Sequence, residues 1–206
     1  MGFYDDWLLP RFMNLMMASK AITEERKKIL SGVAGSVLEV GFGSGRNLPW
    51  YPTSVRRVVA VDPSRASAKL ARKRIEAARF PVEYLPSGGE AIPAGDHSFD
   101  CVVSTFTLCT IPDPVAALEE MRRVLKPGGK LFLAEHGLSA DPNVQRWQHR
   151  MNGVQNFMCG GCNLNRDIRR LVGEAGFGFD EVDQYYMEAT PKFVGFMTRG
   201  IATVVA

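Results

Sequence analysis

The sequence predicts an α/β protein in which helices cover both faces of a mostly parallel sheet. Short apolar runs rich in β-branched residues recur along the chain, and stretches with helical periodicity separate them. The runs are apolar throughout rather than alternating, which is typical of parallel strands that are buried on both faces. The expected strands are residues 36–41, 56–62, 82–86, 99–105 and 130–136.

The clearest predicted helix lies between the fourth and fifth of these runs. Asp113 provides an N-cap acid, and Pro114 occupies the first turn. The Pro-Gly-Gly sequence at residues 127–129 is expected to end the helix. The residues expected to face the core are Val115, Leu118, Met121 and Leu125.

Near the C-terminus the pattern changes to one helix followed by two consecutive strands. Residues 166–177 are expected to form a helix that ends at Gly176. Residues 180–188 and 191–202 are expected to form strands, and the short link before Pro191 suits a hairpin. The sheet should therefore be mixed, with its last strand antiparallel to the others.

The composition is that of an ordinary globular chain. Of its 206 residues, 46% are hydrophobic and 23% are charged, which is enough for one well-buried core, so we expect a single domain over residues 1–206. The formal net charge is only +3, and basic residues are spread among acidic ones. Nucleic-acid binding is therefore not expected.

The N-terminal segment is partly apolar but has the character of neither a signal peptide nor a membrane span. Asp5 and Asp6 stand where a signal peptide would be basic, and Pro10 and Arg11 interrupt the apolar residues. Helical spacing beyond Pro10 gives one apolar face. That face can pack on the core, form a lid over a ligand, or touch a membrane surface through residues 1–19.

The four cysteines do not form the framework of a secreted disulfide-rich domain, so a reducing cytoplasm is the expected location. Cys159 and Cys162 enclose two glycines at a spacing that suits a metal or redox pair. The chain has no second pair of this kind, and His149 is the nearest histidine in sequence. A four-ligand zinc site would need partners from distant parts of the chain, and no metal is expected.

Three glycines at alternate positions, Gly41, Gly43 and Gly45, follow the first expected strand. Glycine accepts positive φ and has no Cβ, so this loop is expected to let a ligand approach the backbone. Arg46 takes the sixth position, where the dinucleotide motif G-x-G-x-x-G has glycine, which argues against an NAD site. The loop better suits a cationic sulfonium with an amino-acid tail, whose ammonium group Glu39 can attract.

Asp62 ends the second expected strand. A carboxylate at this place can accept hydrogen bonds from both hydroxyls of a ribose. It can also cap the helix that is expected to follow, and the two roles are compatible.

Four segments occur in an order and at a spacing that together are specific: "VLEVGFGSG", "VVAVDPS", "FDCVVSTFTL" and "VLKPGGKLFLAEH". Over residues 36–136 they resemble the successive motifs of class I S-adenosylmethionine-dependent methyltransferases. The resemblance implies a Rossmann-like sheet of seven strands in the order 3-2-1-4-5-7-6. It also implies S-adenosylmethionine as the cofactor, bound across the carboxyl ends of the strands.

The resemblance assigns cofactor contacts by position. The expected cofactor-binding residues are Glu39, Gly41, Gly43, Gly45, Asp62, Pro63, Gly89, Glu90, Thr105 and Phe106. Gly88 stands where the family has an acid that binds adenine, so that contact is expected to fall to the Gly89 backbone or to Glu90. Thr105 and Phe106 should stand beside the transferred methyl group.

The second half of the chain carries a narrower resemblance. The segments "FDCVVSTFTLCTIPDP", "LFLAEHG", "GGCNLNRDIRRLVGEAGF" and "PKFVGF" are similar to the small thiol S-methyltransferase group, which implies a thiol or sulfide sulfur as acceptor. Relatives that act on lipid amines or quinone rings share part of the pattern. An amphiphilic N-, O- or C-acceptor therefore stays open, as does a non-catalytic role in binding S-adenosylmethionine.

His136 is the expected base for the thiol proton because it follows the fifth strand at the ligand-binding edge, and a structural role is the alternative. Thr105 is the second expected catalytic residue. The expected acceptor-binding residues are Cys109, His136, Trp147, Met151 and Asn163. Asn163 can instead cap a helix, and Arg166 can meet the cofactor carboxylate or stay solvated.

Four parts of the expected domain follow from these assignments. They are an N-terminal helical cap or lid (1–31), a cofactor-binding core (36–136), an acceptor-side insertion (137–163), and a C-terminal helix with a strand hairpin (164–206).

Overall fold

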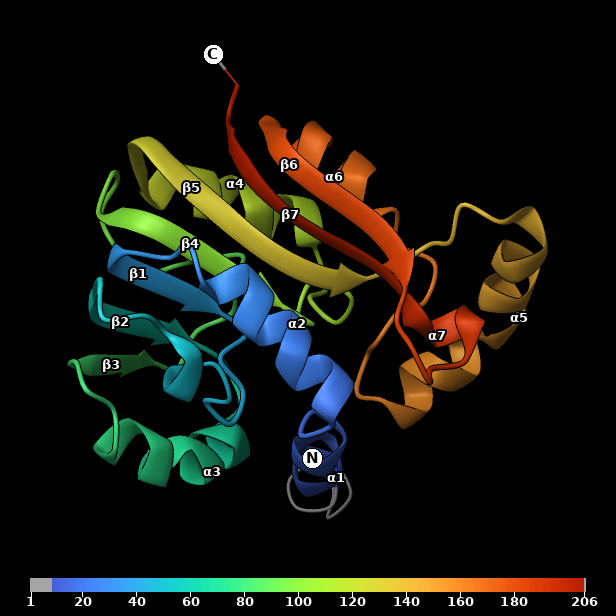
Figure 1. Ribbon diagram of the computed structural model, residues 1–206, viewed down its shortest axis with the longest axis horizontal. Helices are drawn as coiled ribbons and strands as arrows, with labels where there is room; N and C mark the ends of the chain where they lie inside the picture. The colour runs from blue at the N-terminus through green and yellow to red at the C-terminus, as the bar shows by residue number, and fades with distance from the viewer. Residues whose placement is uncertain (1–8, 206) are drawn as a thin grey trace.

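The computed structural model describes residues 9–205, with only the backbone for Leu9 and Pro10 (Figure 1). Expectations for residues 1–8 lie outside the described residues. In chain order the elements are α1 (Leu9–Met16), α2 (Lys20–Leu30), β1 (Gly35–Val40), η2 (Leu48–Trp50), β2 (Val55–Val61), α3 (Arg65–Glu76), β3 (Val82–Leu85), β4 (Phe99–Thr105), α4 (Pro114–Val124), β5 (Leu125–His136), α5 (Pro142–Met158), α6 (Ile168–Glu174), β6 (Phe177–Tyr186), α7 (Lys192–Gly195) and β7 (Phe196–Val204).

The strands form one sheet in the order β3-β2-β1-β4-β5-β7-β6, which confirms the predicted fold class and strand order. Strand β1 pairs in parallel with both β2 and β4, and β4 pairs in parallel with β5. Strand β7 is antiparallel to both of its neighbours, β5 and β6. The strand order reverses between β1 and β4, the place where open α/β sheets hold their ligands.

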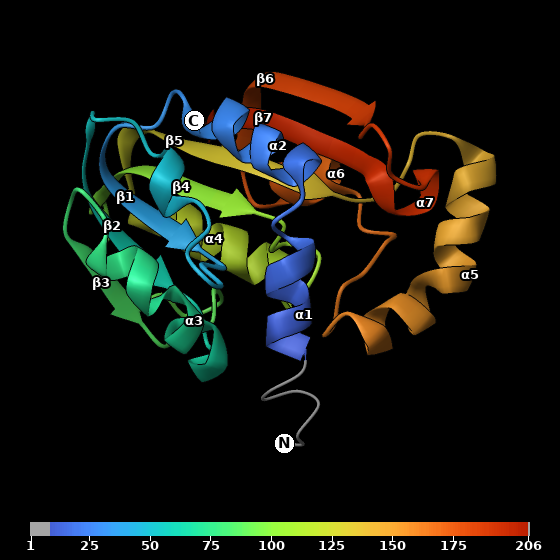
Figure 2. The same cartoon turned by 60° about the horizontal axis from the view of Figure 1, so that its bottom comes forward.

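The sheet is covered on both faces, with α2 and α3 on one side and α4 and α6 on the other (Figures 1 and 2). Successive residues of β1 enter different cores. Val37 packs in the same cluster as Leu30 of α2, whereas Leu38 packs in the cluster that holds Leu118 of α4. Because side chains alternate between two buried faces, the apolar runs show no polar alternation.

Two predicted boundaries are wrong by several residues. Helix α4 ends at Val124, and β5 begins at Leu125, whose backbone is already extended, so the Pro-Gly-Gly stretch lies within β5. The strand predicted for residues 191–202 begins only at Phe196. Its first part forms α7, because the Pro191 carbonyl accepts hydrogen bonds from the N–H groups at 194 and 195.

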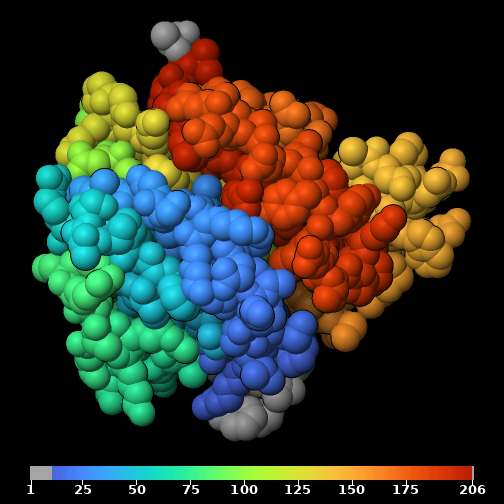
Figure 3. All heavy atoms as spheres, viewed as in Figure 1, coloured from blue at the N-terminus to red at the C-terminus, as the bar shows by residue number. Residues whose placement is uncertain are grey.

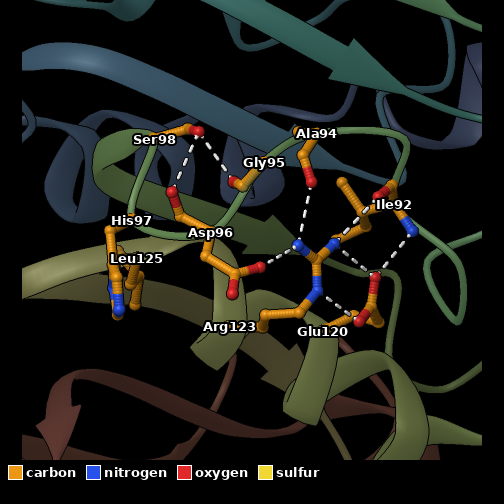
Figure 4. A network of polar contacts seen from close by, with 9 residues as sticks. All are labelled: Ile92, Ala94, Gly95, Asp96, His97, Ser98, Glu120, Arg123 and Leu125. Atoms are coloured by element: carbon orange, nitrogen blue, oxygen red, sulfur yellow. Dashed lines mark hydrogen bonds and ion pairs between the residues drawn. The ribbon is translucent and has the colours of Figure 1, made fainter.

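A polar network fixes the loop that leads into β4 (Figure 4). Arg123 on α4 donates to the carbonyls of Ile92 and Ala94 at 3.0 and 2.8 Å. Glu120, one turn earlier on α4, accepts from the Ile92 N–H at 3.0 Å and also pairs with Arg123. The loop is thereby tied to the helix that packs beneath it.

Helix α1 continues from α2 past the edge of the sheet, and α5 lies beyond the C-terminal elements (Figures 1 and 2). Figure 3 shows α1 and α2 as a continuous ridge between α3 and the hairpin of β6 and β7. Figure 2 shows α1 beside the carboxyl ends of β1 and β4, with α5 on the far side of the C-terminal elements. Within residues 9–205, no helix combines the length and apolar character needed to span a membrane.

Candidate active site

A cavity of about 420 Å³ opens at the carboxyl ends of β1, β2 and β4. It lies where the strand order reverses, as the resemblance implied. The expected cofactor-binding residues that line it are Gly41, Gly43, Asp62, Pro63, Gly89, Glu90, Thr105 and Phe106. Glu39 and Gly45 do not line it.

The three loop glycines are needed for different reasons. Gly41 and Gly45 both have φ of +73°, and a Cβ would lie 2.1 Å from the Thr107 side chain in the first case and 3.0 Å from Phe42 in the second. Gly43, with φ of +54°, has no atom nearer than 3.9 Å to such a Cβ. Close ligand approach therefore accounts for Gly43, whereas Gly41 and Gly45 are required by the packing of the protein itself.

The Asp62 carboxylate joins the glycine loop to the turn after β2. One oxygen accepts the Gly43 N–H at 2.7 Å, and the other accepts the Ser64 N–H at 2.8 Å. Ser64, not Asp62, caps α3 by accepting the Ser67 N–H. Each carboxylate oxygen has a further lone pair, so both can still accept from ligand hydroxyls. Burial raises the pKa of Asp62.

The loop after β3 borders the same cavity through Gly88, Gly89 and Glu90. A Cβ on Gly89 would lie 2.9 Å from Val40, so the backbone of this loop packs directly on β1. The Glu90 carboxylate accepts the Asp113 N–H at 3.4 Å at the start of α4. The residues expected to replace the missing adenine-binding acid are therefore at the cavity.

Arg26 on α2 also lines the cavity, although no motif in the sequence predicts it there. Its side chain is buried, and Nη1 donates to Asn47 Oδ1 at 2.7 Å and to Thr105 Oγ1 at 2.9 Å. The guanidinium lies 5.4 Å from the centroid of the Phe106 ring. Its Nε is buried and has no hydrogen-bond partner in the described chain. The site therefore presents an incompletely paired cation.

Glu39 stands behind this arginine rather than at the cavity surface. Its carboxylate accepts from Asn47 Nδ2 at 3.0 Å and from the Tyr51 hydroxyl at 2.7 Å. Burial raises the pKa of Glu39 to about 7, and burial lowers the pKa of Arg26 to about 10, which leaves the guanidinium charged at neutral pH. The predicted contact between Glu39 and a ligand ammonium group is not formed by this geometry.

A second buried carboxylate, Glu135, holds the loop after β4. It accepts from the Ser104 hydroxyl at 2.8 Å and from the N–H groups of Thr107 and Leu108 at 2.8 and 3.1 Å. Between these anchors, Phe106 has φ of +55°, a conformation that is uncommon for an aromatic residue. Glu135 thus holds Phe106 at the cavity wall, and burial raises the pKa of Glu135 to about 7.

Helix α1 stands at the mouth of the cavity, which is the position of a lid. Met13, Asn14 and Met17 line the cavity, and Asn14 Oδ1 accepts from the Ser44 hydroxyl of the glycine loop at 2.7 Å. Three apolar side chains among the described residues of this helix are exposed to solvent. They are Phe12, Leu15 and Met16, with exposed fractions of 48%, 72% and 52%.

The acceptor-side insertion predicted for residues 137–163 borders the cavity only in part. At the end of α5, Cys159 and Gly160 line the cavity. Trp147 has an exposed fraction of 58% and does not line it, and neither does Met151. Trp147 lies in the solvent-facing part of a helix whose buried residue is Gln148.

Asn163 fixes a loop rather than capping a helix or lining the cavity. Its Nδ2 donates to the Cys109 carbonyl at 3.0 Å, and its Oδ1 accepts from Asn152 of α5. The cap of α6 is Asp167. Arg166 is neither solvated nor at the cavity, since it donates to backbone carbonyls in the loop after β4.

His136 and Cys109 lie outside the cavity lining, where they meet a second cysteine. His136 Nε2 is 3.1 Å from Cys162 Sγ. Burial alone would lower the pKa of His136, but the Cys162 sulfur and Glu135 raise it above its ordinary value. The predicted base therefore faces a sulfur of the protein and not the space available to an acceptor.

Residues 38–133 match the family model described as a methyltransferase domain. A SAM-dependent methyltransferase from Aquifex aeolicus has a similar structure, with a TM-score of 0.66 and 20% identity, covering 95% of this chain and 98% of that chain. A curated thiol S-methyltransferase that is 33% identical is in addition matched over 72% of its own length, so the chain belongs to the class I S-adenosylmethionine-dependent methyltransferases. It is a methyltransferase with S-adenosylmethionine as its cofactor.

Two curated relatives narrow the comparison. The thiol S-methyltransferase TMT1B of Rattus norvegicus is 33% identical over 180 residues, covering 82% of this chain and 72% of the relative. A demethylmenaquinone methyltransferase of Renibacterium salmoninarum is 38% identical over 99 residues, covering 48% of this chain and 40% of the relative. The similarity to the first extends well beyond the cofactor-binding core.

Asp62→Ala is expected to weaken binding of S-adenosylhomocysteine by roughly 100-fold, because a charged acceptor for two ribose hydroxyls is lost along with the anchor of Gly43. Isothermal titration calorimetry measures this directly. Glu83→Gln, on the exposed side of β3, is the matched control and should bind as the wild type does. Wild-type affinity in Asp62→Ala would contradict the ribose assignment.

Glu39→Gln should change how stability depends on pH. The native pKa of about 7 lies above the ordinary 4.5, so the folded state holds the proton more tightly and loses stability as pH rises from about 4.5 to 7. The loss is on the order of 3 kcal/mol for a shift of this size. Urea unfolding at pH 5 and pH 8 should therefore show the variant gaining stability relative to wild type at the higher pH. A difference that is independent of pH would contradict the assignment.

Proposed function

We propose that this methyltransferase transfers the methyl group of S-adenosylmethionine to the sulfur of a small thiol or sulfide. The observation that carries the proposal is the pairing of two features. The chain is similar to thiol S-methyltransferase TMT1B over most of its length, and among the described residues that line its cavity the carboxylates are Asp62 and Glu90, which we assign to the adenosine.

The residues present fit the cofactor. Gly43 leaves open space at a positive φ, and the Asp62 carboxylate faces the cavity with free lone pairs for a ribose. Arg26 has the charge, the burial and the unpaired Nε expected of a group that binds the carboxylate of the methionine part. When bound, S-adenosylmethionine supplies a methyl group on a sulfonium, which a thiolate can displace.

Met13, Met17 and Phe106 line the cavity, and we assign them to the acceptor side. Among the described lining residues the carboxylates are Asp62 and Glu90, both of which belong to the adenosine side. A thiol with a pKa near 8.5 is already partly ionised at neutral pH, so it can react without a base from the protein. A phenol or a carbon acid has a greater need for one.

The charge at the cavity also favours a thiolate over an amine. Arg46 lines the cavity, and nearby positive charge lowers the pKa of a thiol while it disfavours an ammonium group. Arg26 adds little to this effect, because we pair it with the cofactor carboxylate. Thr105 accepts hydrogen bonds from both Arg26 and Asn47 through its hydroxyl oxygen, which leaves its own O–H to donate to a group in the cavity. We therefore propose that Thr105 positions the acceptor and that solvent, not a side chain, removes the thiol proton.

A second candidate is C-methylation of a quinone-like ring. The similarity to demethylmenaquinone methyltransferase favours it, as do the exposed apolar side chains of α1, which could meet an amphiphilic acceptor or a membrane surface. This match covers only 48% of the chain, so C-methylation is the weaker of the two candidate functions.

The proposal predicts that the pH at which kcat/KM levels off follows the thiol and not the enzyme. With three thiols of well-separated pKa, kcat/KM should rise about tenfold per pH unit below each thiol's own pKa and level off above it. Formation of S-adenosylhomocysteine, with the methylated product identified by mass, is the measurement. A plateau at one pH for all three thiols would contradict the proposal and indicate a base in the protein.

The same assay run with a demethylated quinone and a primary amine separates the two candidates. Product from the thiols alone supports S-methylation, whereas product from the quinone alone would contradict it.

A further inference from the structure

Three side chains from distant parts of the sequence meet beside the cofactor cavity. They are Cys109 from the loop after β4, His136 at the end of β5, and Cys162 from the loop after α5. Their sulfur and nitrogen atoms lie within 4.8 Å of one another. Both cysteines are buried, with exposed fractions of 3% and 6%, and neither is part of a disulfide.

Two thiolates and an imidazole are a ligand set that Zn²⁺ prefers. With metal–ligand distances of about 2.3 Å for sulfur and 2.1 Å for nitrogen, tetrahedral ligands lie roughly 3.5 to 3.8 Å apart. His136 Nε2 and Cys162 Sγ are 3.1 Å apart, and the other separations are within 4.8 Å. The three ligand atoms are therefore close to the positions that one ion requires.

The environment of His136 differs from that of a histidine with an ordinary structural role. The exposed histidine His97 places Nδ1 2.8 Å from the carbonyl of Leu125. His136 has a sulfur at one nitrogen, and its buried Nδ1 has no hydrogen-bond partner among the described residues. The contact between Nε2 and the Cys162 sulfur is the feature that bears on metal binding, because an ion at Nε2 would leave Nδ1 without a partner.

Cys159 is the candidate for a fourth ligand, and its side chain must turn toward the cluster, because its sulfur is not among the atoms that lie within 4.8 Å of one another. Cys159 precedes Cys162 by three positions, the C-x-x-C spacing common in zinc sites. The two residues between them, Gly160 and Gly161, have φ of +60° and +91°, which lets the chain turn back so that both sulfurs can face one point. Gln155 on α5 is placed to donate to Cys162 Sγ at 3.7 Å, as an outer partner of a ligating thiolate does.

We propose that Cys109, His136 and Cys162 form a Zn²⁺ site, which Cys159 completes by turning its side chain toward the ion. The ion would join the ends of β4 and β5 to the loop after α5, whose residues Cys159 and Gly160 line the cavity. It would therefore fix the acceptor side of the cavity. The C-x-x-C pair has no further ligands near it in the sequence. Because β4 and β5 are neighbours in the sheet, Cys109 and His136 come together beside it.

The test uses the full chain, without an affinity tag, kept reduced and stripped of metal by a chelator. Titration with Co²⁺ should give about one equivalent bound, with the absorption of a tetrahedral ion and a thiolate-to-cobalt charge-transfer band, and Zn²⁺ should displace it. Cys162→Ser and Cys159→Ser should each weaken Zn²⁺ binding by roughly 100-fold or more. Cys101→Ala, in the core of β4, and His149→Gln are the matched controls and should bind as wild type.

Calorimetry with S-adenosylhomocysteine shows whether each variant is folded, because the cofactor contacts lie elsewhere in the cavity. A variant that loses Zn²⁺ but keeps this affinity supports the site. Wild-type protein that binds cofactor but takes up no Co²⁺ or Zn²⁺ at micromolar concentration would overturn it. Unchanged metal affinity in Cys159→Ser would overturn the four-ligand arrangement.

Discussion

The buried positive charge of Arg26 is the constraint around which the reversal point of the sheet is organised. Thr105 at the end of β4 and Asn47 after β1 both accept hydrogen bonds from its guanidinium. Asn47 in turn donates a hydrogen bond to the Glu39 carboxylate. A buried charge is tolerated only when its surroundings compensate for it. Glu39 compensates the charge of Arg26 only in part, because Asn47 stands between the two side chains. Burial also raises the pKa of Glu39 to about 7, so its carboxyl is partly protonated at neutral pH.

Buried carboxylates also set the shape of the loops around the cavity. Asp62 holds the glycine loop through Gly43, and Glu135 holds the loop after β4 through Thr107 and Leu108. In each case the acceptor is a side chain at the end of a central strand, and the donors are backbone N–H groups that no strand satisfies. The cavity wall is thus fixed before a ligand arrives, which reduces the ordering cost of binding.

Features carried by local sequence could be predicted, and those created by topology could not. Asp62 and Gly43 belong to a strand and its adjoining turn, so their place at the cavity followed from short motifs. Arg26 appears in the sequence as one charge among several on a polar helix, and only the packing of α2 over the end of β4 brings it to the cavity. Trp147 is the opposite case: it was predicted to bind the acceptor, but it is exposed to solvent on α5. An aromatic residue in a long insertion need not face the ligand.

The most direct test of this account compares two ligands on Arg26→Met. S-Adenosylhomocysteine carries the amino-acid carboxylate, and 5′-methylthioadenosine shares its adenosine and thioether but lacks that group. By calorimetry, the substitution should weaken S-adenosylhomocysteine by roughly 10- to 100-fold, the value of one charge-assisted pair, and leave methylthioadenosine nearly unchanged. Equal losses for both ligands, or no loss for either, would contradict the assignment of the buried arginine to the cofactor carboxylate.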